Sequence, residues 1–71
     1  MNLRLDVDRE ADGRWIAEIA EMPGVMSYGA TRDAALTAVK VLALRALADR
    51  IDAGEPGARA LDRIHFGSTA A

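Results

Sequence analysis

Apolar and polar residues alternate strictly at the start of the chain. The apolar positions are Leu3, Leu5 and Val7, and the residues between them are charged. A period of two with one polar side is typical of a β-strand that is buried on one face only. The pattern therefore predicts a first strand over residues 3–8 with one face towards a core.

A second alternating segment follows a hairpin signal. Asp12-Gly13 is a residue pair that favours a tight turn between two antiparallel strands. In the strand after it, we expect Trp15 and Ile19 on the core face together with Leu5. The same alternation leaves Ile16 on the outer face, although it is apolar.

A tight turn, a third strand and a helix cap follow directly, with no long loop between them. Pro23 presets the φ angle of the second position of a type II turn, and Gly24 accepts the positive φ of the third position. A third strand over Val25–Tyr28 then runs back beside the second and ends at Gly29. Thr31 is predicted to cap a helix, because its hydroxyl can accept a hydrogen bond from the first helical turn.

The helix is predicted over residues 32–53. Gly54 suits the left-handed position after a helix end, and Pro56 prevents the helix from resuming. At 100° per residue, one broad apolar stripe is expected to pack on the sheet. It consists of Leu36, Val39, Leu42, Ala43, Ala46 and Leu47.

A second apolar side of the helix lies outside this stripe. Val41, Leu44 and Ala48 cluster there beside Lys40. A helix that is apolar on more than one side is covered on more than one side. We therefore predict that these residues form a partner or oligomer surface. The outer face of the sheet around Ile16 is the alternative candidate for that surface.

A short last strand is predicted near the end of the chain, where Ile64 and Phe66 alternate with polar residues. Since the helix returns the chain, this strand should run parallel to the first and lie beside it. The prediction is a single α+β domain, β-β-β-α-β, with a mixed four-stranded sheet of order 3-2-1-4 and the helix on one face. Residues 1–66 form the domain, and residues 67–71 are expected to be a flexible tail.

Composition narrows the classes of function. A chain of 71 residues is one domain, and a domain of this size has only marginal stability. It has no Cys, so no disulfide or thiolate metal site can stabilise it. Oligomerisation is the remaining common way to add stability. The net charge of −2 favours a basic protein partner over nucleic acid. No basic-apolar leader and no membrane-length apolar run are present, which predicts a cytoplasmic protein with no membrane partner.

The acidic residues of the first hairpin are candidates for a metal site. The segment from Asp8 to Gly13 matches the first half of a calcium-binding EF-hand loop, but Ile19 stands where the loop needs a bidentate Glu. His65 is the only His and has no nucleophile at a suggestive spacing. We therefore predict no catalytic, cofactor-binding or metal-binding residues and no enzymatic activity. A metal-dependent hydrolase is the alternative of a different class.

The turn and cap signals together resemble the HicB-like antitoxin family. The resemblance extends over nearly the whole chain, and it rests on the spacing of Asp-Gly, Pro-Gly and Gly-x-Thr pairs. The residues that carry it are Asp12-Gly13-Arg14-Trp15-Ile16-Ala17, Glu21-Met22-Pro23-Gly24-Val25, Gly29-Ala30-Thr31, Ala34-Ala35 and Gly54-Glu55-Pro56.

The resemblance implies a fold and a function. The family has a truncated ribonuclease H-like fold, and its members bind and neutralise small basic HicA-type toxins that cleave mRNA. Many members carry a further DNA-binding domain, and this chain ends soon after its last predicted strand, so we expect no direct DNA binding. The alternative is a stand-alone homo-oligomer of the same fold with no toxin partner.

Overall fold

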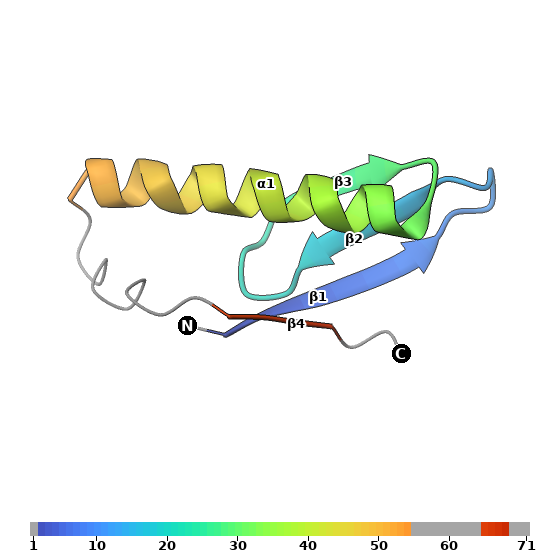
Figure 1. Cartoon of the computed structure of the whole chain (residues 1–71), viewed down its shortest axis with the longest axis horizontal. Coiled ribbons are helices and arrows are strands. Elements are labelled where there is room, and N and C mark those ends of the chain that lie inside the picture. Colours follow the sequence, from blue (N-terminus) through green and yellow to red (C-terminus); the bar gives the residue numbers. More distant parts are fainter. Residues whose placement is uncertain (1, 55–64, 69–71) are drawn as a thin grey trace.

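The three alternating segments of the N-terminal half form an antiparallel meander (Figure 1). The computed structural model describes residues 2–54 and 65–68. The strands are β1 (Asn2–Arg9), β2 (Trp15–Ile19) and β3 (Met26–Gly29). β1 and β2 pair with Leu5 opposite Ile19, so the alternating apolar residues of both strands share one face.

A helix and a fourth strand complete the domain. Helix α1 (Arg32–Asp52) crosses one face of the sheet, and β4 (His65–Ser68) pairs in parallel with β1. The sheet order is β3-β2-β1-β4, so the predicted α+β architecture, order and strand directions are confirmed. The expected tail is wrong at its start, because residues 67 and 68 belong to β4. Residues 69–71, Pro56 and Ile64 lie outside the described residues.

Glycines at positive φ shape the two hairpin connections. The N–H of Val25 donates to the carbonyl of Met22 at 3.0 Å, and Gly24 has a φ of 88°. This is the predicted type II turn, with Pro23 at its second position. In the first hairpin, Gly13 has a φ of 91° and lies in a loop that is longer than two residues, as expected.

The helix begins after the predicted cap and ends at Asp52, one residue before the predicted end. The hydroxyl oxygen of Thr31 accepts a hydrogen bond from the N–H of Ala34 at 3.1 Å. At the other end, Ala53 is the C-cap and Gly54 follows with a φ of 66°. The side chain of Thr31 therefore defines the start of the helix, and the left-handed conformation of Gly54 defines its end.

Gly29 brings the end of β3 against the first turn of α1. A Cβ atom at Gly29 would lie 2.5 Å from the backbone nitrogen of Ala35 and 2.9 Å from the carbonyl carbon of Ala34. Both neighbours are backbone atoms of a helix, which cannot move aside as a flexible side chain can. The short β3–α1 connection therefore depends on the missing side chain.

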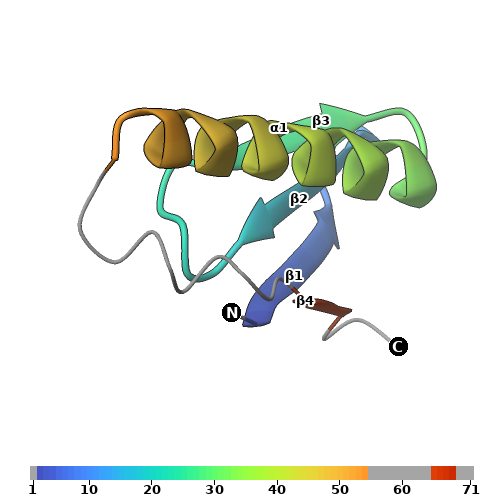
Figure 2. The same ribbon diagram turned by 60° about the vertical axis from the view of Figure 1, so that its left-hand side comes forward.

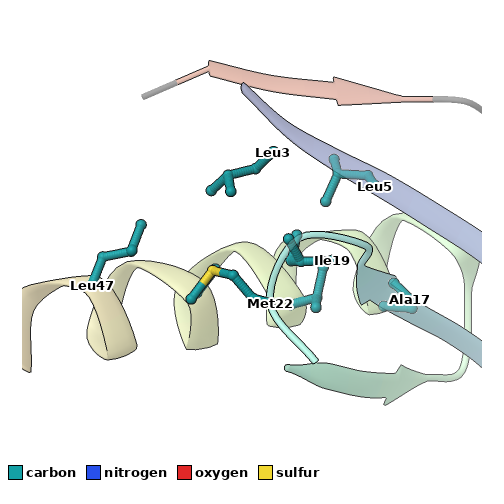
Figure 3. Close-up of a cluster of buried hydrophobic side chains, with 9 residues drawn as sticks. Leu3, Leu5, Ala17, Ile19, Met22 and Leu47 are labelled. Atoms are coloured by element: carbon teal, nitrogen blue, oxygen red, sulfur yellow. The ribbon is translucent and has the colours of Figure 1, made fainter. Parts of the chain in front are cut away.

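The core lies between α1 and the inner face of the sheet (Figure 3). Leu3 and Leu5 enter it from β1, Ile19 from β2 and Leu47 from α1. Trp15 is half-buried and packs against this cluster, as predicted. The fully buried members are Leu3, Leu5, Ala17, Ile19, Met22, Ala35, Val39, Ala43 and Leu47.

The buried side of α1 differs in part from the predicted stripe. Ala35, Val39, Ala43 and Leu47 are buried at steps of four residues. Leu42 was expected in the stripe, but 38% of its surface is exposed. A step of four turns the buried line by 40° each time, so the line moves away from Leu42 along the helix. The helix also packs mainly on β2 and β3 and only slightly on β1.

Candidate functional site

The face of the sheet opposite α1 carries charged and apolar side chains together. Ala17 and Ile19 are buried against the helix, so by alternation Ile16 and Glu18 project to the other side. We call this surface the outer sheet face. Its members are Arg4, Asp6 and Asp8 along β1, Arg14, Ile16 and Glu18 along β2, and Met26 and Tyr28 along β3.

Ile16 lies at the middle of the outer sheet face and is half-buried there. The strand register sets Asp8 and Tyr28 on either side of it, while Glu18 is its neighbour two residues on. A depression of about 350 Å³ is lined by Asp6, Val7, Asp8, Ile16 and Glu18. An apolar residue thus lies in a hollow bordered by three carboxylates.

Positive charge on this face is placed at its two ends. Arg4 lies near the start of β1, where its Nε is 3.7 Å from a carboxylate oxygen of Asp6. Arg14 precedes β2 at the opposite end, and its guanidinium lies over the Tyr28 ring, 4.4 Å from the centroid. The acidic middle and the basic ends give the face an ordered charge pattern along the strands.

The hairpin between β1 and β2 holds Arg14 in this position. The N–H of Arg14 donates to Asp12 Oδ1 at 3.0 Å, and its Nε donates to Oδ2 at 2.7 Å. The backbone hydrogen bond from Arg14 holds the pKa of the Asp12 carboxyl below its ordinary value, and the guanidinium adds to this effect. Asp12 therefore stays ionised and anchors the basic end of the outer sheet face.

A second surface lies on α1, away from the sheet. Val41, Leu44, Ala48 and Ile51 are all exposed. Their spacing of three, four and three residues follows the seam of a heptad repeat, so they line one side of the helix. We call these four residues the exposed helix face.

The structure places the two candidate partner surfaces apart. Val41, Leu44 and Ala48 share the exposed helix face, and Ile16 lies on the outer sheet face, as the alternation predicted. Ile51 was missed and is 53% exposed. Its place seven residues after Leu44 was the signal that could have identified it.

The described residues contain no group of three or more His, Asp or Glu side chains arranged to hold a metal ion. The acidic segment of the EF-hand comparison instead forms β1 and its following hairpin. His65 is exposed at the start of β4. Within the described part of the chain, no helix is long and apolar enough to cross a membrane.

Comparisons with protein-family models, curated proteins and solved structures give no match to this chain. The resemblance to the HicB-like family therefore stays a prediction.

Proposed function

We propose that this protein is a HicB-like antitoxin with a truncated ribonuclease H-like fold. It neutralises a small basic HicA-like toxin, which cleaves mRNA, by direct protein–protein contact in the bacterial cytoplasm. It catalyses no reaction itself and needs no cofactor.

One observation carries this proposal beyond the family resemblance. The outer sheet face presents three carboxylates around the half-buried Ile16. Apolar residues with an oppositely charged surround favour a protein partner over a small substrate, because the apolar part contributes affinity and the charges steer and orient the encounter. A basic, RNA-cleaving toxin has the surface charge that this face would attract.

The test is toxin binding by variants of the outer sheet face. A HicA-like toxin from an adjacent reading frame is co-expressed with the protein, and growth and co-purification are measured. Glu18→Lys should weaken both rescue and co-purification, because it reverses a charge beside Ile16. Asp49→Lys is the matched control, since it makes the same charge change at an exposed site on α1.

Two results would contradict the proposal. If the genome encodes no small basic protein beside this one, the proposed function is wrong. If Glu18→Lys and Asp49→Lys bind a toxin equally well, the proposed binding surface is wrong.

The exposed helix face, with its four apolar residues, favours a second candidate function, a stand-alone homo-oligomer of the same fold. Its signature is self-association of the pure protein without any toxin.

A further inference from the structure

The two exposed surfaces lie on opposite sides of a two-layer domain. Helix α1 covers one face of the sheet (Figure 2). The residues of the exposed helix face lie away from the buried residues of α1. The outer sheet face is uncovered by any described element. Each surface has an apolar middle, and burying this apolar area against a partner would be favourable.

The charges along the exposed helix face run acidic, basic, basic, acidic. Lys40 and Arg45 flank its apolar middle, and Asp33 and Asp52 lie near the two ends of α1. From Lys40 to Arg45 the axial rise is about 7.5 Å. The outer sheet face has the reverse order, with Arg4 and Arg14 at its ends and its carboxylates in the middle.

The spacing of the two charge patterns also corresponds. Asp6 and Asp8 are two residues apart on β1, which is about 6.6 Å along a strand. This separation is close to the axial rise between Lys40 and Arg45, which lie on opposite sides of the apolar line of the exposed helix face. A helix laid along the strands would therefore bring its cationic middle over the acidic middle of the outer sheet face.

Contact of each surface with its own copy is disfavoured by the same charges. In a parallel helix pair along the heptad seam, Lys40 would face Arg45 of the other copy. In an antiparallel pair with Leu44 opposite Ala48, Arg45 would lie beside its own equivalent. Two outer sheet faces would oppose carboxylates to carboxylates. Like charges across a contact reduce its stability.

We propose that the outer sheet face binds the exposed helix face of a second copy of this chain. The contact places Val41 and Leu44 of one copy over Ile16 of the next, with Lys40 and Arg45 among the carboxylates. The two faces are on opposite sides of the domain, so the contact is head-to-tail and does not close at two copies. It goes beyond the antitoxin proposal and competes with it, because a toxin and a second copy would use one face.

The experiment is a charge exchange followed by light scattering on the pure protein. Arg45→Glu alone and Glu18→Lys alone should each weaken self-association about tenfold, since one attraction becomes a repulsion. The double variant, with both changes in one chain, should associate again, because its reversed helix meets the reversed sheet of the next copy. Circular dichroism checks that each variant stays folded.

The control replaces one of the two changes in the double variant. Asp49→Lys has the same charge change as Glu18→Lys but leaves the outer sheet face intact, so a chain with Arg45→Glu and Asp49→Lys should not recover the lost association. The proposal is overturned if the unmodified chain stays at 7.6 kDa at high concentration. It is also overturned if both single variants associate normally, or if the double variant of Arg45→Glu and Glu18→Lys fails to recover association.

These outcomes separate the inference from the antitoxin proposal. Self-association is measured without a toxin, and toxin binding is measured in cells that express one. A chain that neutralises a toxin but stays monomeric overturns only the head-to-tail contact. A chain that self-associates but binds no toxin overturns only the proposed function.

Discussion

Gly29 is a residue at which β3 and α1 approach closely. The position of its missing Cβ lies 2.5 Å from the backbone nitrogen of Ala35, at the first turn of α1. Its backbone φ is not positive, so the demand for glycine comes from space and not from chain conformation. Gly24 is the reverse case, with a φ of 88° and nothing within 4 Å of an added Cβ.

Gly29→Ala should therefore lower the free energy of unfolding by about 2–3 kcal/mol, because the helix backbone has to shift. Gly24→Ala is the matched control and should cost only about 1 kcal/mol, from backbone strain alone. Chemical denaturation of both variants measures the difference. Equal losses would show that the β3–α1 contact is less tight than the structure places it.

Asp12 gives the hairpin a dependence on pH. Its folded-state pKa is lowered, chiefly by the backbone N–H of Arg14. A lowered pKa stabilises the folded state above the unfolded pKa, and this stabilisation is lost as the pH falls through the folded pKa. In Asp12→Asn the titrating group is absent. The variant should melt at a lower temperature than the unmodified chain near neutral pH, and the difference should shrink as the pH falls below the ordinary value of 3.8 and through the lower folded-state pKa. A constant difference across this range would contradict the assignment.

At the scale of elements, α1 has two apolar sides with different roles. Leu47 is 1% exposed and packs in the core, whereas Leu44 is 48% exposed three residues earlier. Leucine truncation in a core removes buried contacts and leaves a cavity, while truncation on the surface does neither. The two residues therefore report separately on the fold and on the exposed helix face.

Leu47→Ala should reduce the free energy of unfolding by about 2–4 kcal/mol, and Leu44→Ala by about 0.5 kcal/mol or less. Thermal melts at low protein concentration measure both, so that association does not add to stability. A large loss for Leu44→Ala under these conditions would mean that the leucine is covered within its own chain.

At the scale of the whole molecule, the predicted assembly is open-ended. A self-complementary contact stops at two copies, whereas a head-to-tail contact forms a ring or continues. The average mass should therefore rise with concentration without a plateau at twice the 7.6 kDa of one chain. Val41→Glu with Leu44→Glu should return the mass to one chain and leave the strand signal of circular dichroism unchanged. A plateau at two copies would instead indicate a symmetric dimer.

Most of the fold could be predicted from the sequence because its signals are local. Alternation of Leu3, Leu5 and Val7, the Pro23-Gly24 turn and the Thr31 cap each depend on a few neighbouring residues. Such signals act through backbone geometry and short-range hydrogen bonds, which do not depend on contacts with distant parts of the chain. Strand order then followed from the short connections and the return of the chain through the helix.

The candidate site depended on contacts between distant segments. The register between β1 and β2 sets Asp8 beside Ile16, and the same register puts Ile16 on the side away from Val41 and Leu44. The direction in which α1 crosses β2 and β3 left Leu42 exposed and buried Leu47. Periodicity states that a helix has two apolar sides, but only packing against a particular sheet selects which side becomes the core and which stays available to a partner.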